Sequence, residues 1–207
     1  MQVTIDGPAG VGKTSVGRQA ARSFSLLFIQ SGQLYRAMAY AKKNGLTDKS
    51  VKLSVDDRGE THLTIDGEDV EEKLETEEIG DLASQMAQRR KVRDGVNDII
   101  VEESRDKDVL VEGRDIGTVV LPDADLKIFL TASPRERAIR RHKQLGGERT
   151  VDEIEKEISH RDERDKSREI APLKPAEDAV IIDTTSLTKN EVVNKISDLI
   201  RRRAANP

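Results

Sequence analysis

A glycine-rich segment near the N-terminus constrains the fold more than any other feature of this sequence. The run Val3-Thr4-Ile5 is apolar enough for a short buried strand, and it ends at Asp6-Gly7. A helix with an apolar stripe is predicted directly after the glycine-rich segment, from about Lys13 to Phe24. A strand, a tight loop and a helix in this order are typical of α/β proteins, whose parallel sheets carry helices on both faces.

The loop has the spacing Gly7-x4-Gly12-Lys13-Thr14, which is the Walker A pattern of phosphate-binding loops. Small residues allow backbone N–H groups to surround phosphate oxygens, and the following helix presents its positive N-terminal end. We expect Lys13 to reach the β- and γ-phosphates of ATP, and the Thr14 hydroxyl to bind the accompanying Mg²⁺. The predicted ATP-binding residues are Gly7, Pro8, Ala9, Gly10, Val11, Gly12, Lys13, Thr14 and Ser15.

Strand and helix patterns continue along the rest of the chain. Further parallel strands are predicted at about 26–29, 109–111, 126–130 and 179–183. Helices are predicted from Ser31, as a cap, to about Gly45, and then at about 76–105, 134–145, 151–168 and 188–203. The last three of these begin at capping-box spacings, which are Ser133 with Glu136, Thr150 with Glu153, and Thr188 with Glu191. The pattern predicts a five-stranded parallel sheet flanked by helices.

Residues 51–70 follow a different pattern, because apolar and polar residues alternate there. Val51, Leu53 and Val55 are matched by Leu63 and Ile65. The segment Asp56-Asp57-Arg58-Gly59 between the two runs has turn chemistry, and Asp66-Gly67 suggests a further turn. We therefore predict a small antiparallel hairpin inserted between helices.

Composition and charge restrict the partners of the chain. The 207 residues fit one main domain, and the net charge of -4 comes from a mixed surface rather than the basic footprint of a nucleic-acid-binding domain. There is no cysteine, and no apolar run approaches the length that a membrane helix needs. We expect a cytoplasmic monomer that binds neither nucleic acid nor membranes.

Several arginines stand beside Gly, Asp or Ser at predicted strand or helix ends. Arg36, Arg93 and Arg114 are of this kind, and Arg137 and Arg141 share a face of one helix. On the next helix Arg161, Arg164, Asp165 and Arg168 also share one face. For most of these arginines a solvated surface position is the simpler interpretation. Arg114-Asp115 directly follows a buried strand, where open α/β sheets bind their ligands, so here a functional role is favoured.

The chain resembles bacterial cytidylate kinases, in the nucleoside monophosphate (NMP) kinase group of P-loop kinases. The matching segments extend over nearly the whole chain. They are IDGPAGVGKTS near the start, SGQLYRA at 31–37, ASQMA at 83–87, KVR at 91–93, EGRDIGTVVLPDADLKIFLTASPRERAIRR at 112–141, RDERDKSR at 161–168, APLKPAEDA at 171–179 and IDTTSLT at 182–188. The chain departs from the pattern at Gln30, where many members have Asp, and at Glu112, which replaces a commoner Asp.

The resemblance implies transfer of the ATP γ-phosphate to CMP or dCMP with Mg²⁺. It implies that Ser84, Arg93 and Asp115 read the cytosine and that Ser31 and Asp165 contact the sugar. The residues that it implies for the phosphates are Arg36, Arg114, Arg161 and Arg168, and the implied catalytic set is Lys13, Arg114, Arg161 and Arg168. The implied division of one kinase domain, 1–207, is a core at 1–30, 106–138 and 170–207, an NMP-binding insert at 31–105, and a helical lid at 139–169 with a mobile region around Arg140 to Arg149.

The chemistry of the residue types is consistent with these roles. Cytosine has an amino donor for a carboxylate, and its ring acceptors suit Arg and Ser donors. A phosphate monoester, with a second pKa of about 6, is already ionised at neutral pH and needs no general base. Two other classes remain open from the residues alone. One is a kinase for another monophosphate, a sugar or a shikimate-like alcohol, with Asp115 as base, and the other is a nucleotide-dependent regulatory protein without turnover.

Overall fold

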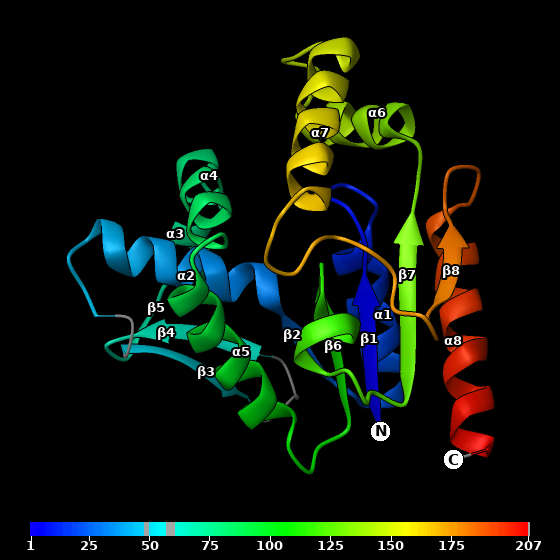
Figure 1. Cartoon of the computed structure of the whole chain (residues 1–207). Coiled ribbons are helices and arrows are strands. Elements are labelled where there is room, and N and C mark those ends of the chain that lie inside the picture. Colours follow the sequence, from blue (N-terminus) through cyan, green and yellow to red (C-terminus); the bar gives the residue numbers. More distant parts are fainter. Residues whose placement is uncertain (48–49, 57–60, 207) are drawn as a thin grey trace.

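A parallel sheet lies at the centre of the molecule (Figure 1). The structure is a computed structural model and describes residues 1–47, 50–56 and 61–206. Within these residues five parallel strands form the sheet, in the order β2 (Leu27–Gln30), β6 (Val109–Gly113), β1 (Gln2–Asp6), β7 (Leu126–Thr131) and β8 (Val180–Asp183). This confirms the predicted fold class. Asp6 pairs with Gly113 and Gln30 pairs with Glu112, so the carboxyl ends of three neighbouring strands meet at one edge.

Helices cover both faces of the sheet. Helices α1 (Lys13–Phe24) and α8 (Lys189–Ala205) pack together on one face, over a core that includes Val3, Ile5 and Leu110. Val109 and Val111, the neighbours of Leu110 on β6, point into the other core, because successive strand residues face opposite sides. The near-continuous apolar strands follow from this double coverage.

The insert between β2 and β6 contains α2 (Ser31–Lys43), α3 (Glu71–Leu74), α4 (Glu77–Met86) and α5 (Arg90–Ser104). It also contains a small antiparallel sheet with the order β3 (Val51–Val55), β4 (Thr61–Ile65) and β5 (Glu68–Asp69). The predicted hairpin is confirmed. The turn at Asp66-Gly67, with positive φ at both residues, leads into the short strand β5, which was not predicted. The predicted turn residues 57–59 lie outside the described residues.

Two predictions for the helices of the insert were wrong in detail. Ser31 is the first residue of α2 and not its cap, since Gln30 holds the cap position. Gly45, with φ of 70°, follows the end of α2 as expected. The predicted helix at 76–105 is divided, because α4 ends before Ala87 and Arg89 is extended. Its amphipathic period alone did not show this break.

Helices α6 (Pro134–Gln144) and α7 (Val151–Lys166) contain most of the predicted lid, and Figure 1 shows them above the ends of the strands. Ala138, Ile154 and Ile158 give these two helices a small core of their own. The capping boxes at Thr150 and Thr188 are both complete. At the start of α6, Ser133 accepts from the Glu136 N–H, whereas the Glu136 carboxylate binds Arg140.

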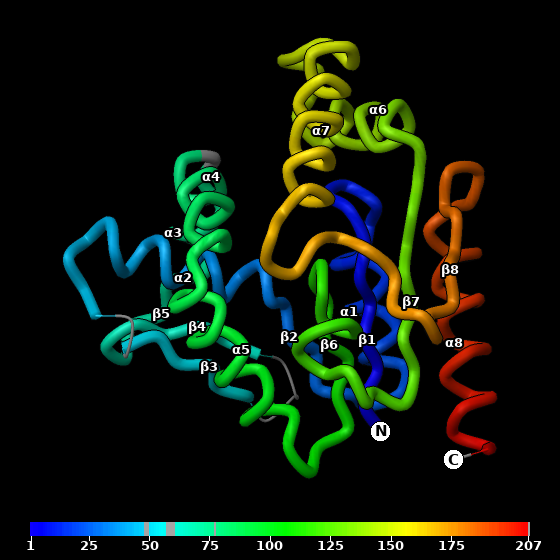
Figure 2. The backbone as a smooth tube through the Cα atoms, in the orientation of Figure 1, coloured from blue at the N-terminus to red at the C-terminus, as the bar shows by residue number. Residues whose placement is uncertain are grey.

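The segment after α7 runs back across the sheet to β8, as the tube in Figure 2 shows. After β6 the chain forms a π-helical turn, η2 (Ile116–Val120), which packs against β1, β6 and α5. Such turns are rare and are frequent at functional sites. No helix in the described ranges is both long and apolar enough to cross a membrane.

Candidate functional site

The phosphate loop connects β1 to α1 with a backbone that requires glycine. Gly7 has φ of 147°, and a Cβ on it would lie 2.2 Å from the carbonyl oxygen of Leu130. Gly12 has φ of 99° and directly precedes α1, whose first turn carries no acidic residue. The N-terminal end of α1 therefore offers positive potential to an anion in the loop.

Lys13 is almost fully buried beneath the loop. Its Nζ donates to the carbonyl oxygens of Gly7 and Pro8, at 2.8 Å each. Burial is the main cause that lowers the pKa of Lys13 well below its usual range, and Arg114 lowers it further, while Glu112 and Asp6 raise it. Asp6, directly before the loop, pairs with Gly113, directly before Arg114, so the phosphate loop and Arg114 begin at the same edge of the sheet.

A polar network extends from Thr14 to the end of β2. The Thr14 hydroxyl donates to Oε1 of Glu112 (2.7 Å), and Nε2 of Gln30 donates to the same oxygen (3.3 Å). The Arg18 guanidinium donates to Oε1 of Gln30 (2.7 Å), which fixes the orientation of the amide. The other oxygen of Glu112, Oε2, is buried and has no hydrogen-bond partner among the described residues. Gln30 and Glu112, where the sequence departs from the family pattern, are thus bonded to each other.

Three of the predicted phosphate-binding arginines gather around one carboxylate. Asp165 is 1 % exposed and pairs with Arg114 (3.3 Å) and with Arg168. Burial is the main cause that lowers the pKa of Arg161, and Arg114 contributes next, whereas Asp165 raises it. The Nε atoms of Arg161 and Arg168 are buried without a partner in the described part of the chain. The cluster therefore carries more positive charge than its own carboxylates balance.

Arg36 enters the site from α2. Its Nη1 donates to the carbonyl oxygens of Leu74, the last residue of α3 (2.6 Å), and of Thr76, the N-cap of α4 (3.1 Å). A Cβ on Gly80 would lie 2.8 Å from Nη2 of Arg36, so this glycine allows the guanidinium to lie against α4. Ser31, on the same helix as Arg36, contacts the end of β6, since a Cβ on Gly113 would lie 2.8 Å from its Oγ.

The predicted base-reading residues include a buried ion pair. Arg93 on α5 pairs with Asp115, and both side chains are buried. Burial raises the pKa of Asp115, although Arg93 and then Arg168 oppose the rise. The Ser84 hydroxyl on α4 is buried and has no partner within the described residues. Tyr35 lies near the pair as well, and burial raises its pKa to about 12. Sequence reasoning quoted Tyr35 in a motif but assigned it no role.

Asp6 is a buried residue of the site that sequence reasoning did not include. Its two carboxylate oxygens accept from the backbone N–H groups of Ile116 (2.9 Å) and Gly117 (2.8 Å). It also directly precedes the phosphate loop, so it joins that loop to the segment that carries Arg114 and Asp115. Its place at the carboxyl end of the first strand was the available signal.

Asp6 should give the free energy of unfolding a distinctive pH dependence. Burial raises its pKa from 3.8 to about 6 against the opposing N–H donors. Between these values the folded state binds more protons than the unfolded state, so stability falls as the pH rises, by up to about 1.4 kcal/mol per unit. We expect Asp6→Asn to remove this contribution. Urea unfolding from pH 4 to 7 measures how steeply the free energy of unfolding changes with pH. The control Asp178→Asn, which replaces an exposed carboxylate, should not make this dependence less steep. Identical slopes for Asp6→Asn and the unmodified chain would contradict the assignment.

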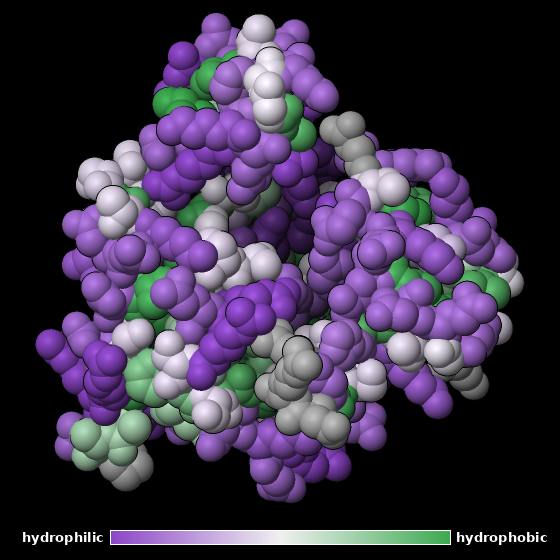
Figure 3. Space-filling view, turned by 180° about the vertical axis from the view of Figure 1, so that it is seen from behind, coloured by the Kyte–Doolittle hydropathy of each residue, from purple (hydrophilic) through white to green (hydrophobic). Residues whose placement is uncertain are grey.

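The molecular surface is hollowed on one side. Figure 3 shows from behind that it is recessed between the sheet, the insert and the helices α6 and α7, and that hydrophilic residues line the recess. Residues of the phosphate loop, α2, α5, α7 and the end of β6 contribute the charges described above.

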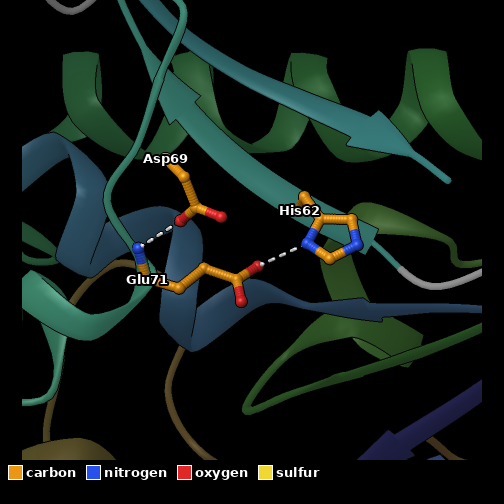
Figure 4. Close-up of side chains that lie close together, drawn as sticks. All are labelled: His62, Asp69 and Glu71. Carbon is orange, nitrogen blue, oxygen red and sulfur yellow. Dashed lines mark hydrogen bonds and ion pairs between the residues drawn. The ribbon is translucent and has the colours of Figure 1, made fainter.

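A second polar cluster lies in the insert, on β4, β5 and α3 (Figure 4). His62 Nδ1 is 3.5 Å from a carboxylate oxygen of Glu71. Glu71 also accepts from the N–H of Leu63 (3.3 Å), and Asp69 accepts from the N–H of Glu71 (2.9 Å). Because both carboxylates already accept from the backbone and are exposed, we interpret this cluster as a set of polar contacts that hold β4, β5 and α3 together.

A parallel sheet with a phosphate loop after β1, together with arginines at the end of β6 and on or just after α7, is the arrangement of a P-loop kinase. The model of one family, cytidylate kinase, matches residues 3–202. The chain belongs to the cytidylate kinase family.

Individual relatives agree with this assignment. A cytidylate kinase of Thermotoga neapolitana is 44% identical over 214 residues, which covers 98% of this chain and 97% of that protein. A cytidylate kinase of Rickettsia canadensis is 43% identical over 202 residues, with 94% and 89% covered. Among solved structures, a gluconokinase from Sinorhizobium meliloti has a TM-score of 0.55 at 16% identity, covering 99% of this chain and 94% of that one. A shikimate kinase from Bacteroides thetaiotaomicron has a TM-score of 0.54 at 13% identity, with 97% and 98% covered. These two structures support the fold alone.

Proposed function

We propose that the chain transfers the γ-phosphoryl group of ATP to CMP and dCMP, forming ADP with CDP or dCDP. The observation that carries the proposal is the buried Arg93–Asp115 pair. Asp115 follows the end of β6, which pairs with the residue that precedes the phosphate loop. Asp115 is suited to accept from the amino group of cytosine, while Arg93 and Ser84 offer donors to its ring acceptors. Uracil would present an oxygen to the carboxylate, and a mismatched polar pair in a buried pocket is costly.

The arginine cluster fits the transferred and accepting phosphates. Lys13 and the loop N–H groups would hold the donor phosphates, and Arg36 and Arg114 the acceptor phosphate. Arg161 and Arg168, with unpartnered Nε atoms, would bind the equatorial oxygens of the phosphoryl group during in-line transfer. Positioning and charge stabilisation supply the catalysis, because an ionised phosphate monoester needs no general base.

We also propose that Mg²⁺ accompanies ATP and is held by Thr14, with Glu112 beside it. The residues fit the ion, because Oε2 of Glu112 is a buried carboxylate oxygen left without a partner by the described residues. Oxygen ligands of this kind suit Mg²⁺. The bound ion would neutralise charge on the β- and γ-phosphates. Gln30 and Thr14 both donate to Oε1, which leaves Oε2 free for the ion or for its water.

The division into parts is a proposal of the same kind. We infer a core at 1–30, 106–138 and 170–207, an NMP-binding insert at 31–105, and a lid at 139–169. Ser31 and Asp165 would contact the sugar from the insert and the lid, respectively. We propose a cytoplasmic monomer.

A coupled assay of ADP release tests the proposed function. We expect ADP formation to be stimulated by CMP and dCMP, more weakly by UMP, and not by AMP or shikimate. The variant Lys13→Ala controls for contaminating kinases. Stimulation by shikimate instead would establish an alcohol acceptor, and no ADP production with any acceptor would favour a regulatory protein; either result overturns the proposal.

The role of Glu112 can be tested separately. We expect Glu112→Gln to raise by about tenfold the Mg²⁺ concentration needed for half-maximal rate, because ligand-orienting groups contribute 10- to 100-fold to metal affinity. Electron paramagnetic resonance of Mn²⁺, bound with a non-hydrolysable ATP analogue, measures the affinity directly. The exposed Glu102→Gln serves as the matched control. Equal Mn²⁺ affinity for the Glu112 variant and the control would exclude the assigned role.

A further inference from the structure

Arg137 on α6 is 2% exposed, which makes it the most deeply buried arginine among the described residues. This differs from the solvated position that the sequence favours for most of its arginines. Its Nη1 and Nη2 donate to the two carboxylate oxygens of Asp162 on α7, at 3.0 and 2.5 Å. Two bonds in parallel hold the guanidinium and the carboxylate in one plane.

The remaining donors of Arg137 reach other parts of the site. Nε donates to the carbonyl oxygen of Ala132, directly after β7 (3.0 Å), and Nη1 also donates to that of Ala9, in the phosphate loop (3.1 Å). The loop packs against the stem of the same side chain, since a Cβ on Gly10 would lie 3.5 Å from Cβ of Arg137. One side chain thus connects the phosphate loop, the sheet and the lid.

The position of Asp162 gives this connection a functional consequence. It lies next to Arg161 on α7, and Asp165 follows one turn later. Because a helix is rigid over a single turn, the ion pair that fixes Asp162 also fixes the residues proposed to bind the phosphoryl group and the sugar. A change in the path of the loop at Ala9 is transmitted to them through one guanidinium.

We propose that Arg137 and Asp162 are a positioning pair, which aligns α7 with the phosphate loop and thereby couples the binding of ATP to the binding of the acceptor. The proposal rests on the proposed function for the identity of the acceptor. The donors of Arg137 and both oxygens of Asp162 are engaged by protein groups, so we assign the two residues a positioning role rather than a substrate contact. The coupling arises because nucleotide in the loop orders Ala9, Arg137 and α7 together, so the second ligand meets a site that is already aligned.

A purely structural ion pair is the alternative, and the chain contains a matched control for it. Arg135 joins the same two helices by pairing with Asp152 and Glu155, but this pair is exposed and involves no residue of the phosphate loop. Its removal tests whether any α6–α7 link affects coupling. Removing only Arg137 or only Asp162 would leave a buried charge unpaired and destabilise the fold. The informative variant therefore replaces both, as Arg137→Met with Asp162→Leu.

Isothermal titration calorimetry with a non-hydrolysable ATP analogue, with and without saturating CMP, measures the coupling. We expect CMP to tighten binding of the analogue by roughly 5- to 150-fold in the unmodified chain, the usual range of such coupling. In the double variant this factor should fall to within about twofold of one. Arg135→Ala should keep the full factor. If the double variant does not fold, Arg137→Lys is judged by the same factor, because a lysine keeps a cation beside Asp162 but cannot reproduce the donors to Ala132 and Ala9.

Either of two results would overturn the proposal. One is a coupling factor near one in the unmodified chain, and the other is an unchanged factor in the folded variants. Failure of CMP to bind at all would instead count against the proposed function. The acceptor identified by ADP release would then replace CMP in the same titrations, so the positioning pair is tested whichever acceptor is correct.

Discussion

Replacing Arg161 by alanine should lower kcat by about 10³-fold, the lower end of the effect of an arginine that stabilises a phosphoryl-transfer transition state. The surroundings of this side chain disfavour its positive charge, because burial and the neighbouring Arg114 lower its pKa. Its Nε has no partner among the described residues. A cation in such surroundings stabilises a bound anionic ligand rather than the folded chain itself.

The same reasoning predicts that Arg161→Ala keeps or increases thermal stability. Removing a partly buried charge that is repelled by Arg114 and Arg36 relieves an unfavourable interaction. Steady-state kinetics and calorimetry on one preparation measure both quantities. Arg164→Ala, which removes an exposed arginine of the same helix, is the control and should leave kcat unchanged. Wild-type turnover by Arg161→Ala, or a large loss of stability together with the loss of kcat, would contradict the assignment.

The parts of the fold that could be predicted are those determined by residues close together in the sequence. The phosphate loop needs its glycines wherever it occurs, and the spacing from Arg161 to Arg168 places these residues on one face without knowledge of the fold. The complete capping boxes at Thr150 and Thr188 are local in the same way. Placement of Arg114-Asp115 at the end of a buried strand was also sufficient to select them, because ligands bind at that edge of a parallel sheet.

The unpredicted features depend on contacts between distant residues. Arg137 bonds Ala9, which is 128 residues away in sequence, and nothing in the local pattern distinguishes it from Arg141. Similarly, Asp6 binds N–H groups that are 110 and 111 residues away. The break between α4 and α5 and the short strand β5 were missed because tertiary packing decides them, and propensity does so only weakly.

Both the local sequence and the tertiary contacts are needed to recognise the Arg93–Asp115 pair. The sequence supplied the two residues as base-reading candidates, but it could not indicate that they pair with each other. Arg93 on α5 and Asp115 after β6 are 22 residues apart, and the packing of the insert against η2 brings them together. Such a pair holds a donor and an acceptor in place before the base arrives, which reduces the cost of ordering them on binding.

The second large effect is expected for Asp115→Ala, which should reduce the preference for CMP over UMP by about 100-fold. One well-made pairing with a base edge contributes about 1–3 kcal/mol of discrimination, and burial places this carboxylate at the upper end. The change should appear mainly as a higher KM for CMP, because the interaction is with the base and not with the reacting phosphoryl group.

The ratio of kcat/KM for CMP and UMP is the quantity to measure, because Asp115→Ala also leaves Arg93 buried without its partner. That loss should destabilise the fold by about 3–5 kcal/mol, and a smaller folded fraction would lower both rates equally. The ratio within one preparation cancels this effect. Asp94→Ala, an exposed acidic residue next to Arg93, should leave the ratio unchanged. If the ratio for Asp115→Ala equals that of the unmodified chain, the carboxylate does not read the base, and Ser84 with Arg93 must account for the selectivity.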